Sequence, residues 1–197
     1  MSEARTQKAE LRAQLLQARR GLTAGEREAA AAALGKSVRD LPELARGRTV
    51  AAYISVGTEP GTHEIVDAMR NAGTRVLLPV LLPDNDLDWA EYRGRAALER
   101  THRGLLEPTG RRLGTQAVTG VDTVLLPGLA VDTHGVRLGR GGGSYDRVLA
   151  RLRAADAHPP LMVLLYAHEV VESVPREPHD HLVDVAITPE GVHRFAR

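Results

Sequence analysis

The spacing of apolar residues changes once along the chain, near residue 49. Before that point leucine and alanine recur every three or four positions, as one face of a helix requires, which predicts a helix over residues 2–20. Thr23 and Glu26 fit a capping box, in which the two side chains satisfy N–H groups at a helix start. A second helix is therefore expected to run to about Arg39, so that residues 1–40 form a helical pair before a linker at 42–47.

From Thr49 onward, short apolar runs alternate with helical patterns and turn residues. Strands are predicted over residues 49–55, 75–82, 87–92, 122–126, 161–166 and 183–188, and helices over 63–71 and 145–154. Thr62 is placed to cap the first of these helices and Gly73 to end it, and Pro79 suggests the end or the edge of its strand. Strands that alternate with helices are typical of a sheet with parallel pairs. Residues 49–197 are therefore expected to be the α/β core of one 197-residue domain.

Composition narrows the possible classes of protein. Apolar residues make up 43% of the chain, charged residues make up 26%, and the net charge is +1, so nothing favours nucleic acid or an acidic membrane surface as a partner. The absence of cysteine excludes disulfides, thiolate metal sites and cysteine nucleophiles. No apolar run approaches the roughly 20 residues of a membrane span, and the first residues lack the apolar centre of a signal peptide. A cytoplasmic protein is therefore expected.

Glycine and arginine are concentrated in one stretch, Arg137-Leu-Gly-Arg-Gly-Gly-Gly-Ser-Tyr-Asp146. Consecutive glycines can aim successive N–H groups into one concavity, and a helix N-terminus behind them adds about half a positive charge. Phosphate binding uses this combination, although a glycine run alone is equally typical of a mobile surface loop. Arg137 and Arg140 favour the anion site, because planar guanidinium groups suit phosphate oxygens. Ligands in such sheets lie beyond the C-terminal ends of strands, which makes 56–62 and 127–145 the two expected places.

Neither of two common phosphate motifs fits this stretch. A Walker loop needs a lysine that the stretch lacks, and Ser144 stands where a dinucleotide fingerprint has its third glycine. Asp146 has two compatible roles: it can stabilise the following helix by about 0.3–1 kcal/mol, or it can hold Mg²⁺ beside bound phosphates. The chain has no Gly-x-Ser-x-Gly elbow, so serine-triad chemistry is not expected.

A stripe of basic residues lies beside the apolar face of the first predicted helix: Arg5, Lys8, Arg12 and Arg19. From this segment alone, a solvated charged face is the better interpretation. Motifs elsewhere in the sequence change that interpretation for Lys8 and Arg12.

Several ordered motifs resemble those of the 5-formyltetrahydrofolate cyclo-ligases, also called methenyltetrahydrofolate synthetases. The family pattern Arg-Leu-Gly-x-Gly-x-Gly-Tyr-Tyr-Asp is similar to residues 137–146, which follow a Pro-Gly-Leu-Ala-Val-Asp segment at 127–132. A Lys-x-x-Leu-Arg motif matches residues 8–12, and a Glu-x-x-Thr turn matches residues 59–62. Further matches are Glu107-Pro108 and the late Asp180 in Pro178-His-Asp-His181. The resemblance extends over most of the chain.

This resemblance implies an enzyme that uses ATP and Mg²⁺ to convert 5-formyltetrahydrofolate into 5,10-methenyltetrahydrofolate, with release of ADP and phosphate. It implies a three-layer αβα sheet, mostly parallel and similar to the sugar-phosphate isomerase and CoA-transferase folds, with an N-terminal helical pair. The implied ATP contacts are Lys8, Arg12, Arg137, Leu138, Gly139, Arg140, Gly141, Gly142, Gly143, Ser144 and Tyr145. The implied folate contacts are Glu59, Arg140, Gly141, Gly142, Gly143 and Ser144, and the implied Mg²⁺ ligands are Asp146 and Asp180. Arg137 and Arg140 are the implied catalytic residues.

Two positions depart from the family pattern. Ser144 replaces the first of two tyrosines, and Gly61 stands where the family commonly has an acidic residue, so that recognition of the pterin would depend on Glu59 alone. The departures keep a second hypothesis open, a non-catalytic module that binds folate or a phospho-ligand. A sugar-phosphate isomerase on the same fold would need an acid/base pair, and we can place none in the sequence.

The implied reaction needs no nucleophilic side chain. The formyl carbon of an amide resists attack by a neighbouring amine, because oxide is a poor leaving group. Transfer of the γ-phosphoryl group to the formyl oxygen gives an imidate phosphate, from which N10 closes the ring and phosphate departs. The protein must align the two reactants and offset charge on the transferring group, which arginines, backbone N–H groups and one metal ion can do. We expect a monomer whose ligands are ATP and a reduced folate.

Overall fold

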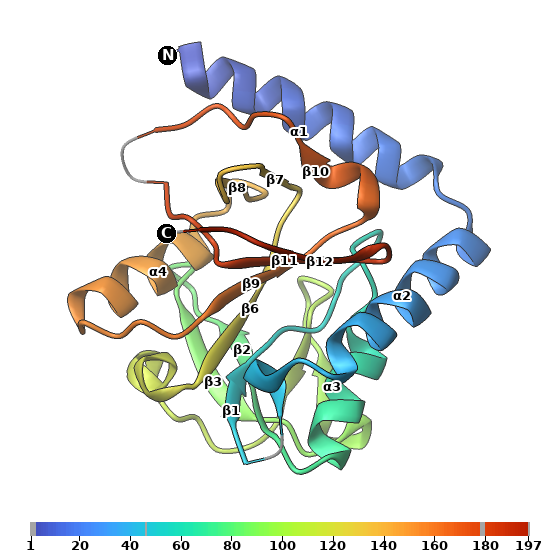
Figure 1. The fold of residues 1–197 in the computed structure, drawn as a ribbon. Helices are drawn as coiled ribbons and strands as arrows, with labels where there is room; N and C mark the ends of the chain where they lie inside the picture. The colour runs from blue at the N-terminus through green and yellow to red at the C-terminus, as the bar shows by residue number, and fades with distance from the viewer. Residues whose placement is uncertain (1–2, 46, 178–179, 197) are drawn as a thin grey trace.

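The computed structural model describes residues 3–45, 47–177 and 180–196 (Figure 1). Two helices come first, α1 (Glu3–Gly21) and α2 (Ala24–Arg39), as the sequence predicts. The predicted capping box is present: Glu26 N–H donates to Thr23 Oγ1 at 3.2 Å, and Thr23 N–H donates to the Glu26 carboxylate at 2.7 Å. Part of the predicted linker forms a short 3-10 helix, Pro42–Leu44. Ser2, Arg46, Pro178 and His179, which fall in predicted segments, lie outside the described residues.

A seven-stranded sheet forms the centre of the core, in the order β12-β11-β9-β6-β1-β2-β3. The strands are β1 (Thr49–Ala51), β2 (Arg75–Leu81), β3 (Leu87–Glu91), β6 (Thr123–Pro127), β9 (Leu161–Leu164), β11 (Val185–Thr188) and β12 (Gly191–Arg194). The inner strands β11, β9, β6, β1 and β2 pair in parallel. The edge strands β3 and β12 pair antiparallel. The prediction of a mostly parallel sheet is confirmed.

Helices cover both faces of this sheet, which gives three layers (Figure 1). On one face, α2 and α3 (His63–Asn71) share a core with strand residues such as Val50. On the other face, α4 (Ser144–Ala154) packs through Val148 with strand residues such as Ala51. Neighbouring residues of one strand therefore enter opposite cores, which explains why the strands appear in the sequence as continuous apolar runs.

A second sheet of three short strands lies beneath α1 (Figure 1). Its strands are β10 (Val170–Val171), β7 (Ala130–Asp132) and β8 (Arg137–Leu138), and the sequence predicted a loop over most of this region. Leu15 of α1 packs with Leu129 in a third apolar cluster. The first helix therefore rests on the small sheet that leads into the glycine stretch.

Two local predictions hold only in part. Pro79 lies inside β2, which is an inner strand of the sheet. However, β1 pairs only with residues 75–77 of β2. The N–H group that proline lacks is therefore not needed for pairing with β1. Thr62 occupies the N-cap position of α3 but makes no side-chain capping bond; its hydroxyl donates to the Tyr53 carbonyl at 2.8 Å. The prediction for Gly73 is confirmed, since it follows the end of α3 with a φ of 91°.

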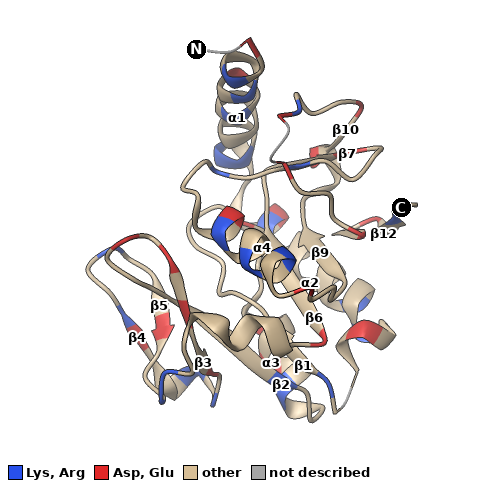
Figure 2. Ribbon diagram, turned by 90° about the vertical axis from the view of Figure 1, so that its left-hand side faces the viewer, with Lys and Arg blue, Asp and Glu red and all other residues tan. Residues whose placement is uncertain are grey.

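A β-hairpin projects from the body of the molecule beside β3 (Figure 2). Its strands are β4 (Leu98–Arg100) and β5 (Leu106–Pro108). The Glu107 carboxylate accepts a hydrogen bond from Leu81 N–H at 3.0 Å, which ties the hairpin to the end of β2. This places the hairpin next to the C-terminal ends of the central strands.

Candidate active site

A cavity of about 290 Å³ lies where the central parallel strands end. One wall is apolar and comes from the strand ends, β3 and the hairpin: Tyr53, Ile54, Pro79, Leu81, Leu87, Leu105 and Leu106. Residues 139–146 also line the cavity. Both places expected from the sequence contribute, because Val56 and Glu59 of the first turn also line the cavity.

The glycine stretch forms the loop between β8 and α4. Gly141 and Gly143 have φ values of 91° and 78°, in the left-handed region that favours glycine, and Gly143 is the N-cap residue of α4. The first N–H groups of any helix lack carbonyl partners within it and carry the positive end of its dipole. Ser144 and Asp146, in the first turn of α4, line the cavity. The loop therefore has the left-handed glycines and the helix start that the predicted anion cradle requires, and the anion site itself stays a prediction.

Arg137 lies beneath this loop and is almost fully buried. Its guanidinium donates to the carbonyl of Pro127 at 3.0 Å and to the Asp146 carboxylate at 3.2 Å. A Cβ atom at Gly139 would lie 2.9 Å from Arg137 Nη1, so a side chain there would displace the guanidinium from its present position. Burial lowers the pKa of Arg137, and the Asp146 carboxylate opposes this effect. Within the described residues Arg137 Nε is buried and has no hydrogen-bond partner.

Arg12 reaches the same loop from α1. Its Nε donates to the carbonyl of Gly139 at 2.8 Å, and its guanidinium carbon would lie 3.5 Å from a Cβ atom at Gly141. Two arginines that are distant in the sequence thus contact one glycine loop, which suits an anionic ligand.

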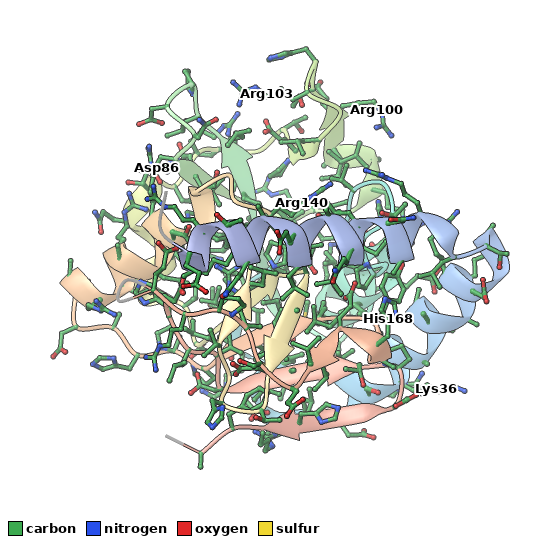
Figure 3. All side chains as sticks on the ribbon, turned by 90° about the horizontal axis from the view of Figure 1, so that it is seen from above. Lys36, Asp86, Arg100, Arg103, Arg140 and His168 are labelled. Atoms are coloured by element: carbon green, nitrogen blue, oxygen red, sulfur yellow. The ribbon has the colours of Figure 1, made fainter. Side chains whose placement is uncertain are left out.

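Glu59 and Arg140 meet at the cavity. Glu59 lies in the turn after β1, where one carboxylate oxygen accepts from Val56 N–H at 2.8 Å and the other accepts from Arg140 Nη1 at 3.3 Å. The side chain of Glu59 is 11% exposed, whereas that of Arg140 is 53% exposed and stands near α1 in the view from above (Figure 3). The structure therefore brings together a residue expected to contact folate and a residue expected to contact both ligands.

The interpretation of the basic stripe as a solvated face is wrong for Lys8 and Arg19. Lys8 is 4% exposed, and its Nζ donates to both carboxylate oxygens of Asp180, at 2.8 and 2.6 Å, and to Glu177 at 3.0 Å. Arg19 is 1% exposed and pairs with Glu169 at 2.6 Å. Charged residues in this stripe therefore anchor α1 to the core.

The two expected Mg²⁺ ligands lie in different surroundings. Asp146 is exposed and accepts one bond from Arg137, whereas the Asp180 carboxylate is mostly buried and already binds Lys8. Within the described part of the chain, no three His, Asp or Glu residues gather as a closed metal site. Mg²⁺ usually takes one or two carboxylates together with substrate phosphate oxygens. Asp146 lines the cavity and fits that role, whereas Asp180 is not among the residues that line it.

Several residues of the cavity were missed by sequence reasoning. Tyr53 follows a buried strand and carries the same apolar signal as the core, and Leu105 and Leu106 lie in a hairpin that the sequence did not predict.

The Tyr145 hydroxyl is buried and without a partner among the described residues. Burial raises the pKa of Tyr53 and of Tyr145 well above the usual tyrosine value, so both hydroxyls stay neutral.

The departure at Gly61 has a local structural reason. A Cβ atom at this position would lie 2.9 Å from the Cβ of Ala31 in α2. The alanine-rich helix thus packs directly on the turn and leaves no room for a side chain. The departure at Ser144 is at the start of α4, on the cavity wall.

These features define a three-layer α/β protein with a small-molecule site at the strand ends, and comparison with known proteins identifies the family. The sequence model of the 5-formyltetrahydrofolate cyclo-ligase family matches residues 4–189. A 5-formyltetrahydrofolate cyclo-ligase of Mycolicibacterium smegmatis is 38% identical over 188 residues, 93% of this chain and 94% of the relative. The enzyme of that name from Escherichia coli K12 is 29% identical over 180 residues, 89% of this chain and 97% of the relative.

Solved structures agree with this result. The 5,10-methenyltetrahydrofolate synthetase of Aquifex aeolicus has a TM-score of 0.81 and 27% identity, covering 96% of this chain and 93% of that one. The chain belongs to the 5-formyltetrahydrofolate cyclo-ligase family, and the protein is an enzyme of the ligase class. None of its described helices is long and apolar enough to cross a membrane. The cytoplasmic location, the monomeric state and the likeness to the sugar-phosphate isomerase and CoA-transferase folds stay predictions.

Proposed function

We propose that this protein uses ATP and Mg²⁺ to convert 5-formyltetrahydrofolate into 5,10-methenyltetrahydrofolate, with release of ADP and phosphate. One observation carries the proposal: a single cavity is lined by the glycine loop with a helix N-terminus and also by Glu59 with an apolar surface. The first group of residues suits phosphates, and the second suits a flat pterin ring that has polar edges. Both reactants can therefore lie in contact.

In this proposal ATP lies along the glycine loop, residues 137–145. Arg12 supports the assignment because it already contacts the loop at Gly139. Lys8 would reach the phosphates by leaving Asp180, to which it now donates. Since α1 supplies both cations, the helices of residues 1–40 and the core of residues 49–197 would act as one catalytic unit.

The folate would lie against Glu59 and residues 140–144, with its ring on the apolar wall. Asp146 and Asp180 would hold Mg²⁺ against phosphate oxygens of the nucleotide, where the ion would offset negative charge. Arg140 bonds Glu59 and lies in the glycine loop, so it would contact both ligands at the point where they meet.

The reaction would proceed in two steps on the substrates. The formyl oxygen attacks the γ-phosphorus of ATP, and ADP leaves. N10 then attacks the carbon of the imidate phosphate and loses its proton as the ring closes. The carbon–oxygen bond breaks and releases phosphate that contains the former formyl oxygen. Arg140 and Arg137 would act as catalytic residues by offsetting charge on the transferring group while the loop holds the reactants in line.

An activity assay with the purified protein tests the proposal. Methenyl-folate should form from 5-formyltetrahydrofolate only when Mg-ATP is present, with one ADP per product. Turnover without nucleotide would contradict the mechanism. Isothermal titration separates this reaction from the binding module that the sequence left open, which would bind 5-formyltetrahydrofolate with no effect of ATP and no release of ADP.

A further inference from the structure

Buried side chains connect α1 with the turn that carries Glu59. Arg19 and Glu169 are 1% and 0% exposed, and the guanidinium donates to both carboxylate oxygens, at 2.6 and 3.0 Å. Arg19 also donates to the carbonyl of Gly128 at 2.6 Å. The second oxygen of Glu169 accepts from the backbone N–H of Tyr166 at 2.9 Å. The ion pair therefore holds the backbone of Tyr166 in place.

Tyr166 continues this connection to the turn. Its hydroxyl donates to the carbonyl of Thr58 at 3.1 Å, across 108 residues of sequence. Its ring stacks on His168, with centroids 5.9 Å apart, and the Arg19 guanidinium lies 5.7 Å from the ring centroid. The His168 side chain is labelled in Figure 3 and is 42% exposed, so the ring contacts both a buried cation and an outer imidazole. These contacts restrain the direction of the hydroxyl.

Thr58 precedes Glu59 in a tight turn. The φ of Gly57 is 62°, and Glu59 N–H donates to the carbonyl of Val56 at 3.2 Å. The Glu59 carboxylate accepts from Val56 N–H, so it is bound to the turn itself. These bonds fix the shape of the turn, whereas the bond from Tyr166 fixes the position of its tip. The direction of the carboxylate at the cavity therefore depends on Tyr166.

We infer that Tyr166 is a positioning residue that holds Glu59 for the folate, and that the buried Arg19–Glu169 pair fixes Tyr166. The inference rests on the proposed function, which assigns the folate contact to Glu59. Tyr166 is not one of the residues that line the cavity, so it acts through the Thr58 carbonyl and not through direct contact with substrate.

The test compares Tyr166→Phe with Tyr92→Phe. Both tyrosines are 3% exposed and both hydroxyls donate to an oxygen, but Tyr92 bonds Asp67, and neither Tyr92 nor Asp67 lines the cavity. Tyr166→Phe should raise the KM for 5-formyltetrahydrofolate about 3- to 10-fold, as expected for loss of one hydrogen bond, and leave the KM for ATP unchanged. Tyr92→Phe should change neither KM. Equal changes in both KM values, or the same folate effect in both variants, would overturn the inference.

A double variant tests whether the effect passes through Glu59. If it does, Tyr166→Phe combined with Glu59→Gln should raise the folate KM no more than Glu59→Gln alone. Independent, multiplicative effects would contradict the inference.

A readout without substrate separates this inference from the proposed function. Amide hydrogen exchange at residues 56–62 should be faster in Tyr166→Phe than in the unchanged protein, and should not change in Tyr92→Phe. Unaltered exchange in Tyr166→Phe would overturn the positioning role even in an active enzyme. If the unchanged protein makes no methenyl-folate, the proposed function fails, while faster exchange would still support the positioning of the turn.

Discussion

Lys8 Nζ donates to both carboxylate oxygens of Asp180, at 2.8 and 2.6 Å, although 172 residues separate them in the sequence. The proposed function assigns Lys8 to the phosphates of ATP and Asp180 to Mg²⁺. In this structure the two opposite charges neutralise each other in a nearly buried pair. When Mg-ATP binds, Lys8 and Asp180 would exchange their contact with each other for contacts with phosphate and with Mg²⁺. Neither charge would then be left unpaired in the core.

Lys8→Met should weaken the use of Mg-ATP. Loss of a hydrogen bond to a charged group corresponds to about 1.5–3 kcal/mol, so we expect the KM for Mg-ATP to rise on the order of 10- to 100-fold in initial-rate measurements. Lys36, the other lysine of the chain, is exposed on α2 and provides the control. Lys36→Met should leave the KM unchanged, and the same result for Lys8→Met would show that Lys8 is only structural.

Arg140→Ala and Asp146→Asn should abolish turnover while the fold stays intact. The Arg140 side chain is 53% exposed, so Arg140→Ala should change the free energy of unfolding by no more than about 0.5 kcal/mol. Asp146→Asn removes the carboxylate charge beside the buried Arg137, so its free energy of unfolding should fall further while the fold persists. Product formation should fall about 100-fold or more, because both groups are assigned to charge at the phosphoryl group. Arg147→Ala, at a similarly exposed arginine of α4, is the control. If both variants keep their activity, the loop is scaffolding.

The Arg19–Glu169 pair should dominate the stability of the contact between α1 and the core. Replacing one partner, as in Glu169→Leu, leaves a buried uncompensated charge and should lower the free energy of unfolding by about 3–5 kcal/mol. The double variant Arg19→Met with Glu169→Leu should lose less than either single variant. Denaturant unfolding curves measure both. Additive losses in the double variant would mean that the two charges are not coupled.

Restoring an acidic residue at Gly61 should destabilise this protein. Because a Cβ atom there would meet Ala31 at 2.9 Å, Gly61→Asp should lower the free energy of unfolding by about 1–3 kcal/mol. Adding Ala31→Gly removes the opposing methyl group and should recover part of the loss, apart from the small cost of glycine in a helix. Thermal unfolding of the three variants decides this. An unchanged melting temperature in Gly61→Asp would show that α2 moves aside.

Asp86 should contribute to the acid sensitivity of the fold. Burial raises the pKa of this carboxyl, but the hydrogen bonds from Arg151 and from Leu87 N–H outweigh burial, so its pKa lies below the usual value. The unfolded chain then binds more protons at low pH, and the stabilisation is complete above about pH 3.9 and is lost as the pH falls through the folded pKa.

Asp86→Asn should therefore lower stability at neutral pH and flatten its decline below about pH 4. Urea unfolding at a series of pH values provides the measurement. Asp84→Asn is a suitable control because that carboxylate is 68% exposed and only 3.8 Å from its nearest cation, Arg147. If the stability of Asp86→Asn falls with decreasing pH as steeply as that of the unchanged protein, the Asp86 carboxyl is not a source of the pH dependence.

Much of the fold could be predicted because local patterns and tertiary packing agree. The long helices and the central strands have strong periodicity or continuous apolar runs. Strands of two or three residues, such as β7 and β8, have too little sequence for a periodic signal and form because α1 packs on them through Leu15. The position of Pro79 was predicted only in part because β2 can hold a proline there only where the neighbouring strand β1 has already ended. The sequence around Pro79 does not contain the length of β1.

The glycine loop could be predicted from composition, but the partners of its charges could not. Helical spacing puts Lys8 and Arg19 on one face, yet burial of that face depends on Asp180 and Glu169, which come much later in the chain. The hydroxyl of Tyr166 likewise finds Thr58 only after the sheet has formed. Such long-range pairs leave no periodic trace in the sequence.

The three anchors of α1 also set an order of assembly. Arg12, Lys8 and Arg19 find their partners 127, 172 and 150 residues further along the chain. During synthesis α1 is made well before any of them, so its cations stay in water until those later residues are available. A chain interrupted before Asp180 lacks β11 and β12 as well as the partner of Lys8, so it cannot bury Lys8 as the finished enzyme does.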